Sequence, residues 1–455
     1  MTIEGVLTVL AAFMTVLAAL TLLRFLAYWF AVSDALWEDR PLDAGDVSAF
    51  SWHFFIPCRD EEAVIGTSMA RLRETYPGCH VWVIDDHSED GTRALIEERA
   101  AWDDHIHLVA RRMPAARLGK GAALNAAYRQ LSDWLPAGAD RGDVVVCVVD
   151  ADGQLAGNAL EQASAAFADP DVGGAQIGVR MRNAGEKPAR PGANRLVDAH
   201  ARWLVRMQDV EFSVNNAGMQ ILRRRTGSVG LGGNGQFVRL TALDSLADGT
   251  IHAWPDGALL EDYESGLLMR LEGWELTHLE GTYVSQEAVT STRRFLTQRT
   301  RWAQGNLQCL RYLPRIVNSP HYTVWGKWET VYTLLQGPLH VLLALTTTLF
   351  AALTLVACVQ DPGAHVFAHM LLPGALFLVA AGPLALWGTR YRALRRRDAR
   401  RGAGVVWGLG LWLYTYHLFW VSCRGLARIV LGRNGWAKTR RNAEAVGVGP
   451  IAKEV

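Results

Sequence analysis

Apolar residues in this chain of 455 residues follow two patterns, long uncharged stretches and short runs separated by polar segments. The long stretches contain no Asp, Glu, Lys or Arg and cover residues 5–23, 330–360, 365–389 and 402–423. Each is close to the roughly 20 residues that a helix needs to cross a bilayer. Residues 33–329 contain the short runs, with charged residues and glycines between them. The hydrophobic pattern therefore predicts a soluble domain attached to membrane-spanning helices.

This pattern divides the chain into five parts. They are an N-terminal transmembrane helix (1–32), a soluble domain (33–310), an interfacial segment (311–329), about three C-terminal transmembrane helices (330–431) and a basic tail (432–455). A cleaved signal peptide is the alternative for the first stretch. We expect an anchor instead, because the first residues lack the basic charge of a signal peptide and the apolar run is longer.

Within the soluble domain, short apolar runs alternate with segments of helical periodicity. Strands are expected at 52–56, 81–84, 106–109 and 144–149, and helices at 64–76, 92–102 and 121–135. The last strand has the sequence VVVCVV, as expected of a strand that is buried on both faces of a parallel sheet. Strand–helix units in this order predict an open α/β sheet.

Charge and cysteine content narrow the class of protein. The net charge of +1 lacks the basic excess of most nucleic-acid-binding proteins, so we expect no nucleic-acid partner. The six cysteines form no CxxC pair. We interpret them as free thiols in a reducing compartment, not as disulfides or zinc ligands.

Seven arginines lie within residues 390–401, between two predicted spans. Positive charge between spans favours the cytoplasmic side. This orientation predicts a multi-pass protein of the plasma membrane with a cytoplasmic soluble domain and an external N-terminus. Four crossings would leave the basic residues at 438–441 outside, which contradicts the same rule. Either the last apolar segment turns back, or one segment lies in the membrane interface.

Acidic residues follow two of the expected strands. Asp85 and Asp86 follow the second strand, and Asp150 and Asp152 follow the fourth. In open α/β sheets the ligand binds beyond the carboxyl ends of the strands, and paired carboxylates suit Mg²⁺ or Mn²⁺. These loops lack the GxGxxG of a dinucleotide site. The alternative for Asp85 and Asp86 is a cap on the helix expected from residue 92.

Two further motifs lie later in the chain. Glu261 and Asp262 begin an expected helix. The alternative is that these acids do no more than balance the dipole of that helix. Gln298, Arg301 and Trp302 are spaced to share one helix face. Arginine binds diphosphates bidentately and tryptophan offers a flat surface to a sugar ring. The alternative for this segment is an amphipathic helix in the membrane interface.

In this order, the motifs resemble those of the processive members of glycosyltransferase family 2, such as cellulose, chitin and hyaluronan synthases. That family has an acidic pair, a DxD motif, a Thr-Glu-Asp motif and a QxxRW motif. The matching residues are Asp85-Asp86, Asp150-Ala151-Asp152, Leu260-Glu261-Asp262 and Gln298-Arg299-Thr300-Arg301-Trp302. The first loop (Pro57 to Glu62) and the lysine segment (Gly119 to Asn125) are also similar, so the resemblance covers residues 54–305.

Two positions depart from the family pattern. Leu260 stands where the family has threonine, which leaves the carboxylates of the motif in place. The glycine-rich stretch 232–235 lies where acceptor contacts are expected, but it does not match the cellulose or hyaluronan synthases. Its glycines are equally well explained by a turn. The identity of the sugar is therefore left open.

The resemblance implies a fold and a set of site residues. The fold is a GT-A-type open mixed sheet with a Rossmann-like nucleotide-binding half, flanked by transmembrane and interfacial helices. Asp262 is implied as the general base. The other implied sites are a nucleotide-sugar site (Glu61, Asp86, Lys120, Asp150 and Arg301), an acceptor site (Trp302, Gln298 and Glu261) and a Mg²⁺ or Mn²⁺ site (Asp150 and Asp152).

The implied reaction is an inverting, metal-dependent transfer from a nucleotide-diphosphate sugar, expected to be a UDP-sugar, to a growing β-linked polysaccharide. The alternative is a non-processive enzyme that glycosylates a membrane lipid, as ceramide glucosyltransferases do. Four spans are few for a polymer channel unless the protein forms a homo-oligomer. The expected partners are the donor, a glycan or lipid acceptor and membrane lipids. A transporter is disfavoured, because few ionisable residues lie in the spans, namely Arg24, His340, His369 and His417.

Overall fold

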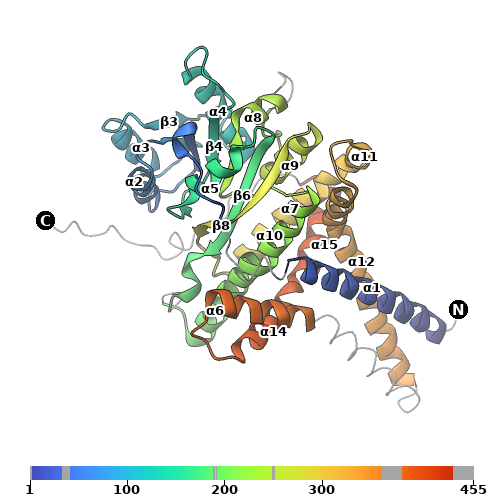
Figure 1. Cartoon of the computed structure of the whole chain (residues 1–455). Coiled ribbons are helices and arrows are strands. Elements are labelled where there is room, and N and C mark those ends of the chain that lie inside the picture. The colour runs from blue at the N-terminus through green and yellow to red at the C-terminus, as the bar shows by residue number, and fades with distance from the viewer. Residues whose placement is uncertain are drawn as a thin grey trace.

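The computed structural model describes residues 3–32, 41–187, 190, 192–247, 252–360 and 382–433. A mixed sheet surrounded by helices forms most of the molecule (Figure 1). Two long helices, α1 (Ile3–Val32) and α12 (Val324–Gln360), extend together away from the sheet.

The first half of the sheet is parallel and has the predicted strand–helix order. Its strands, in spatial order, are β3 (Ile106–Ala110), β2 (His80–Asp85), β1 (Ser51–Cys58) and β4 (Val144–Val148). The connecting helices are α2 (Ile65–Thr75), α3 (Thr92–Ala100) and α4 (Lys120–Trp134). These bounds lie close to the ranges expected from the sequence, so this part of the prediction is confirmed.

The second half makes the sheet mixed. β7 (Gln236–Arg239) is antiparallel to β4 and to β6 (Val172–Met181), and β8 (Glu275–Gln286) is parallel to β6 and antiparallel to β5 (Gln154–Leu155). Helices α5 (Ala159–Phe167), α8 (Leu240–Leu246) and α9 (Glu261–Leu271) pack against these strands. Within the described residues the strand order is β3-β2-β1-β4-β7-β6-β8-β5. The predicted open mixed sheet is thus confirmed.

Both faces of the sheet are buried, because successive side chains of each strand enter different cores. In β1, Phe54 and Ile56 enter one core and Phe55 enters the other. In β4, Val146 enters the same core as Phe55 and Cys147 the same core as Phe54, and the whole strand is buried. This packing explains the uninterrupted apolar sequence of β4, and it holds the carboxyl ends of β1, β2 and β4 at one edge. Cys58, Cys79, Cys147, Cys309 and Cys423 are free thiols in the structure.

Further helices lie between the sheet and the long helices. α6 (Arg195–Val210) continues through a π-helical turn (Glu211–Asn216) into α7 (Ala217–Thr226). α10 (Thr292–Gln308) leads through a short 3-10 turn into α11 (Leu313–Asn318). α10 itself packs against α12 and α15 (His417–Val430). The predicted interfacial segment 311–329 therefore contains α11 and the start of α12.

Within the described residues, the two long helices are each apolar and long enough to cross a membrane, over residues 5–30 and 324–357. They contact each other, and Arg24 of α1 forms an ion pair with Glu329 of α12 at 2.9 Å. These helices account for the first two predicted spans and are consistent with association with a membrane.

The other two predicted spans have a different outcome. Residues 365–389 lie mostly outside the described residues, and only 382–389 belong to a described helix, 382–395. The segment 402–423 does not form a single helix, because it is divided between α14 (Ala403–Thr415, 13 residues) and α15 (14 residues). Each is shorter than the roughly 20 residues of a crossing helix. α14 packs against α6, and the predicted crossing by this segment stays a prediction.

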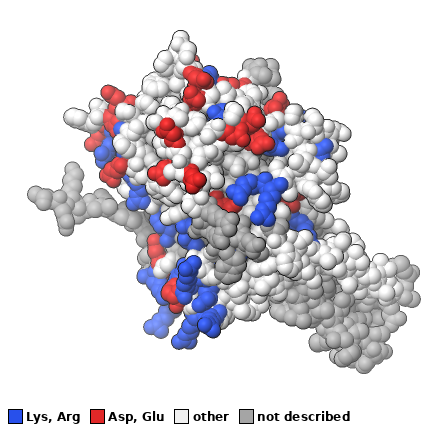
Figure 2. Space-filling model, viewed as in Figure 1, with Lys and Arg blue, Asp and Glu red and all other residues white. Residues whose placement is uncertain are grey.

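The arginine-rich turn at 395–401 joins the helix 382–395 to α14. Lys and Arg side chains gather on this side of the molecule, over α6 and α14 (Figure 2). The two joined helices approach closely, since a Cβ atom on Gly388 would lie 2.1 Å from the carbonyl oxygen of Gly404. The basic tail lies almost wholly outside the described residues.

Candidate active site

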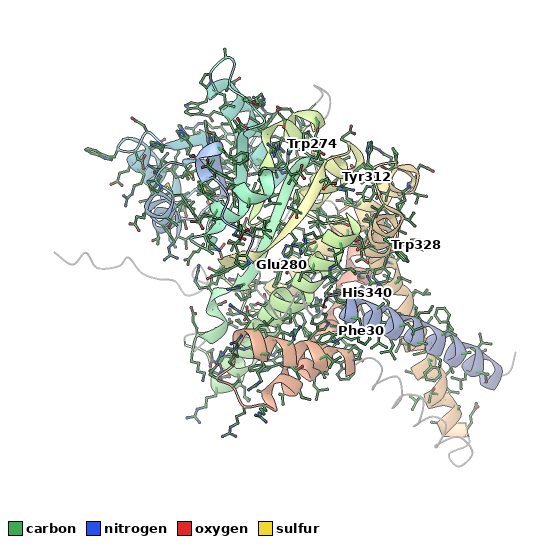
Figure 3. All side chains as sticks on the ribbon, viewed as in Figure 1. Phe30, Trp274, Glu280, Tyr312, Trp328 and His340 are labelled. Atoms are coloured by element: carbon green, nitrogen blue, oxygen red, sulfur yellow. The ribbon has the colours of Figure 1, made fainter. Side chains whose placement is uncertain are left out.

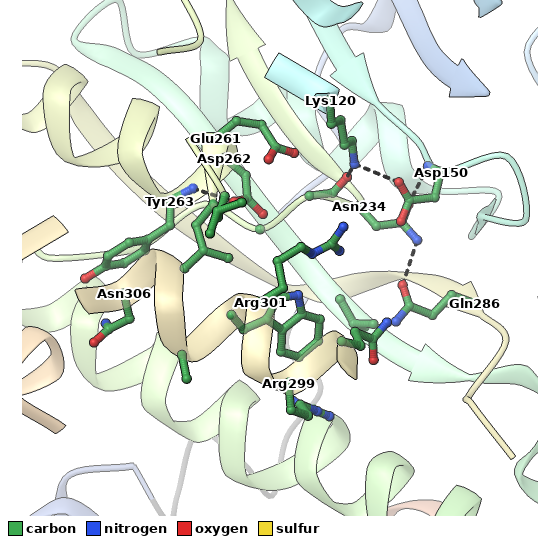
Figure 4. Close-up of a pocket in the computed structure, with 18 of the residues that line it drawn as sticks. Lys120, Asp150, Asn234, Glu261, Asp262, Tyr263, Gln286, Arg299, Arg301 and Asn306 are labelled. Atoms are coloured by element: carbon green, nitrogen blue, oxygen red, sulfur yellow. Dashed lines mark hydrogen bonds and ion pairs between the residues drawn. The ribbon is translucent and has the colours of Figure 1, made fainter. Parts of the chain in front are cut away.

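A cavity of about 590 Å³ lies beyond the carboxyl ends of β1, β2 and β4. Its walls include the loops after these strands, the starts of α4 and α9, and α10. Every site residue expected from the sequence lines it: Glu61, Asp86, Lys120, Asp150, Asp152, Glu261, Asp262, Gln298, Arg301 and Trp302. Figure 4 shows part of this arrangement. The fold therefore brings the separate motifs into one site.

Glu61 and Asp86 are buried where the loops after β1 and β2 meet. The N–H of Glu61 donates to Thr92 Oγ1 at 2.7 Å. Asp86 Oδ1 accepts hydrogen bonds from the Arg111 guanidinium and from the N–H of Arg117, the latter at 3.0 Å. Asp86 is thus held by a buried cationic partner that sequence analysis did not identify, because no local pattern connects the two residues.

Asp85 has a different environment from Asp86. Its Oδ1 accepts a hydrogen bond from the N–H of Ser88 at 3.0 Å, which shapes the turn after β2. At the first turn of α3, it is Asp90 that accepts from the N–H of Thr92, also at 3.0 Å. The alternative in which Asp85 or Asp86 caps this helix is therefore wrong.

Lys120, the first residue of α4, connects several parts of the site. Its Nζ donates to Asp150 Oδ1 at 2.7 Å and to the carbonyl oxygen of Gly233 at 2.5 Å. Burial acts to lower the pKa of the ammonium group, but the charges of Asp150, Glu261 and Asp262 outweigh it and raise the pKa above that of an ordinary lysine. Lys120 is therefore a fixed positive charge in the cavity.

Asp150 and Asp152 line the cavity on either side of Ala151. Asp152 Oδ2 accepts a hydrogen bond from the N–H of Glu287 at 2.9 Å. Over the described part of the chain, no group of three or more His, Cys, Asp or Glu side chains is placed to hold a metal. Mg²⁺ at phosphate sites is commonly bound by one or two carboxylates and completes its shell with phosphate and water oxygens. The carboxylate pair fits a cation of this kind.

Glu261 and Asp262 begin α9 and lie close to Lys120 (Figure 4). Burial, and then the charge of Asp262, raise the pKa of Glu261 to about 7. Burial also raises the pKa of Asp262, although Lys120 acts against this rise. Asp262 Oδ1 accepts a hydrogen bond from the N–H of Tyr263 at 2.8 Å. Enclosed carboxylates with raised pKa values are typical of groups that accept a proton, and mere helix-dipole partners need no such enclosure.

α10 places Gln298, Arg301 and Trp302 on the wall of the cavity. Arg299, on the same helix, forms a bidentate ion pair with Glu211 of the π-helical turn, at 2.6 and 3.0 Å. The Arg299 guanidinium also lies over the Trp302 ring, 4.2 Å from its centroid. α10 thus packs against α12 and α15 and forms one wall of the cavity.

Sequence analysis missed residues that support the carboxylates. Asn234 Oδ1 accepts a hydrogen bond from the N–H of Asp150 at 3.2 Å, and Asn234 Nδ2 donates to Gln286 Oε1 at 2.9 Å. At Gly235 the backbone has φ +72°, a conformation that favours glycine. The GGNG sequence signals a special turn, but only the tertiary structure shows which groups it supports.

Gly233 leaves space between two charged groups of the site. A Cβ atom there would lie 3.0 Å from Lys120 Nζ and 3.1 Å from Asp262 Oδ2. Any side chain at this position would therefore push these groups apart.

The cavity continues past Trp302 to the C-terminal helices. Gln336 and His340 of α12 and His417 and Ser422 of α15 line this end. The sequence marks the two histidines only as ionisable residues of predicted spans. Their place in the cavity depends on the packing of helices that are far apart in the chain.

A family profile described as Glycosyltransferase like family 2 matches residues 52–305. This match covers more than half of the chain and includes all of the motifs described above. The chain belongs to glycosyltransferase family 2. The glycosyltransferase therefore has the enzyme class and the GT-A-type fold that its motifs imply.

Two curated relatives are beta-monoglucosyldiacylglycerol synthases. The one from Synechocystis sp. is 31% identical over 283 residues, which are 61% of this chain and 52% of the relative. The one from Trichormus variabilis is 32% identical over 262 residues, 57% of this chain and 49% of the relative. The chain spans about half the length of these relatives. The family profile confirms membership of family 2. The two relatives are named for lipid products, so they do not support the processive subgroup.

Among solved structures, a mannosyltransferase from Pyrobaculum calidifontis in complex with GDP-Man and Mn²⁺ is similar to the glycosyltransferase. The similarity covers 90% of this chain and 99% of that chain, with a TM-score of 0.55 and 18% sequence identity. At this identity the likeness shows the fold alone.

Proposed function

We propose that this glycosyltransferase transfers a hexose from a nucleoside diphosphate sugar to the hydroxyl group of a membrane lipid. The observation that carries the proposal is the extent of the cavity, which runs from Glu61 and Asp86 beside the sheet to α12 and α15. One site can therefore hold a water-soluble donor at one end and a lipid at the other. The names of the two glucolipid synthases support a lipid acceptor.

On the donor side, Glu61 and Asp86 would bind the base and ribose, and Lys120 and Arg301 would offset the charge of the diphosphate. The DxD carboxylates would hold Mg²⁺ or Mn²⁺, which when bound supplies positive charge at the leaving diphosphate. The Mn²⁺ in the complex of the Pyrobaculum enzyme is in keeping with such a cation.

On the acceptor side, Asp262 would take the proton of the lipid hydroxyl as its oxygen forms a bond to the anomeric carbon. The bond from that carbon to the diphosphate breaks on the opposite side, so the single displacement inverts the configuration. The raised pKa of Asp262 makes it a stronger base than an exposed aspartate. Glu261, Gln298 and Trp302 would hold the acceptor against the donor.

A β-linked polysaccharide is the other product that the same chemistry could form. It has less support, because the two relatives are named for glucolipids.

The proposal is tested with the full chain in lipid nanodiscs that contain dioleoylglycerol. A panel of UDP- and GDP-sugars, each labelled in the sugar, is supplied as donor. The expected product is a labelled glycosyl diacylglycerol that is extracted into organic solvent. Label that accumulates only in an insoluble or high-mass glycan would contradict the proposal and favour a polysaccharide.

A further inference from the structure

The end of the cavity beyond Glu261 and Asp262 is lined by residues of α12 and α15. We call it the membrane chamber, and its polar lining includes Asn216 of the π-helical turn, Gln336 and His340 of α12, and His417 and Ser422 of α15. Figure 3 shows His340 below the sheet, where α12 passes the end of α1. The chamber is continuous with the rest of the cavity, so an occupant could reach the reacting groups.

Two polar residues of the membrane chamber lie on a helix that is otherwise apolar. Gln336 and His340 are four residues apart, on one face of α12. They belong to the segment 324–357, which is apolar and long enough to cross a membrane. Polar side chains in such segments usually face the protein interior or a substrate path. Between them, Gly337 brings the helix against Leu307 of α10, since a Cβ atom there would lie 3.1 Å from Leu307 Cδ2.

The arginines at this end of the cavity are paired with protein groups. Arg299 is bound bidentately by Glu211. Arg223 donates to Thr333 Oγ1 at 3.0 Å and lies 3.7 Å from Glu329. Glu211 therefore balances the charge of Arg299, whereas Glu329 is shared between Arg223 and Arg24.

His417 offers a hydrogen-bond acceptor in this lining. Its Nδ1 lies 2.6 Å from the carbonyl oxygen of Tyr414, so Nδ1 is the donor and Nε2 of the neutral ring is an acceptor. This Nε2 is buried and has no hydrogen-bond partner in the described part of the chain. A buried acceptor without a partner is unfavourable, and a hydroxyl group bound beside the ring would relieve this.

A chamber of this composition suits an uncharged headgroup better than a phosphate. Arg299 and Arg223 of the lining are already engaged by Glu211, Thr333 and Glu329, and the neighbouring carboxylates Glu261 and Asp262 would repel a phosphate. The chemistry agrees with this, because a phosphate oxygen is already anionic, whereas a hydroxyl must lose a proton to a base such as Asp262.

Building on the proposed function, we propose that the membrane chamber binds the uncharged, hydroxyl-bearing headgroup of the acceptor lipid and selects it over lipids that end in a phosphate. Gln336 and His340 are the positioning residues. Their amide and imidazole groups hydrogen-bond the headgroup and present its reactive hydroxyl to Asp262.

The test compares Gln336→Leu and His340→Leu with the wild type in nanodiscs that contain dioleoylglycerol. Thr347→Val, at an exposed position of the same helix, is the matched control. Each leucine variant is expected to raise the KM for dioleoylglycerol about tenfold, equivalent to about 1.4 kcal/mol. The kcat and the affinity for the free nucleotide should change by less than about twofold, since the lost contacts are to the acceptor alone.

A conservative variant and a second lipid complete the experiment. His340→Gln keeps a hydrogen-bonding group and is expected to recover part of the lost affinity for dioleoylglycerol. The wild type is expected to leave dioleoyl phosphatidic acid unglycosylated. Unchanged KM values in both leucine variants, or rapid glycosylation of phosphatidic acid, would overturn the chamber's role while lipid glycosylation itself would stand. If the wild type forms no glycolipid with either lipid, the proposed function fails first and the chamber's role fails with it.

Discussion

Single residues in the cavity depend on one another's charge. Lys120 contacts Asp150 directly, and its charge limits the rise in the pKa of Asp262 that burial causes. The carbonyl oxygen of Gly233 accepts from the same ammonium group. A change at one of these positions therefore alters its neighbours, and predictions at this scale need matched controls.

Asp262→Asn keeps the size of the side chain but cannot accept a proton. If Asp262 is the general base, kcat is expected to fall by about 10²–10⁴. The affinity for UDP, measured by calorimetry, should stay near normal because the proposed nucleotide contacts lie elsewhere in the cavity. Loss of nucleotide binding with normal turnover of bound donor would instead make Asp262 a structural residue, and Glu261 would be the next candidate for the base.

Gly233→Ala tests whether the glycine preserves the spacing of charged groups. The added methyl group would crowd Lys120 Nζ and Asp262 Oδ2. A misplacement of about 1 Å in a reacting group can cost about 100-fold in rate, so a fall of up to this size in kcat is expected. Gly232→Ala is the control, since its methyl group would meet its nearest atom at 3.5 Å, an ordinary contact. Equal activities of the two variants would contradict the prediction.

The carboxylates Asp150 and Asp152 predict dependence on a divalent cation. EDTA is expected to abolish sugar transfer, and added Mn²⁺ or Mg²⁺ to restore it, because the leaving diphosphate needs positive charge beyond that of the protein. Release of nucleotide from the donor measures the reaction. Full turnover by enzyme that has been stripped of metal would remove the metal from the mechanism.

At the scale of elements, the parallel strands β1, β2 and β3 place His53, His80 and His107 close together. His53 is fully buried, and its Nδ1 lies 3.1 Å from Trp82 Nε1. An indole N–H can only donate, so Nδ1 must carry no proton in the folded protein. Burial, with smaller effects of His80 and His107, lowers the pKa of His53 from 6.5 to about 3.

The depressed pKa of His53 predicts a loss of stability in mild acid. The unfolded chain binds a proton at His53 below about pH 6.5, whereas the folded chain does so only near pH 3. The contribution of neutral His53 to stability is fully present above pH 6.5 and is lost as the pH falls toward 3. At pH 5 the loss in the free energy of unfolding is about 2 kcal/mol. Thermal unfolding at pH 7.5 and pH 5 measures this loss. His53→Gln should show a smaller difference between the two midpoints, and an unchanged difference would contradict the assignment.

The sequence predicted the elements correctly where burial on both faces of the sheet shaped the apolar pattern. It did not predict how helices are divided where contacts between distant segments decide the structure. β4 is apolar because both of its faces are covered, so its sequence alone predicts a strand. The segment 402–423 is equally apolar, but it forms two helices. α14 packs against α6 and α15 against α10, while Val406, Leu413 and Trp420 are exposed. Apolar composition does not show whether such a segment forms one helix or two, so this division was not predicted.

For the whole molecule, the arginine-rich turn predicts the side of the membrane on which the sheet lies. Positive charge beside membrane helices favours the cytoplasm. A cysteine introduced as Arg396→Cys should resist an impermeant thiol reagent in intact cells and react after permeabilisation. The unmodified chain serves as the control for labelling of native cysteines. Labelling in intact cells would place the turn outside and contradict the predicted orientation.

The sequence by itself determined the order of strands and helices in the nucleotide-binding half, the acidic motifs after β2 and β4, and the shared face of Arg301 and Trp302. These features follow from local periodicity and residue chemistry. Only the tertiary structure decided the pairing of Asp86 with Arg111, the close approach of Gly233 to its charged neighbours, and the union of α10, α12 and α15 around one cavity. Such contacts join residues far apart in the chain, and their geometry depends on how the cores and helices pack, which no short-range pattern encodes.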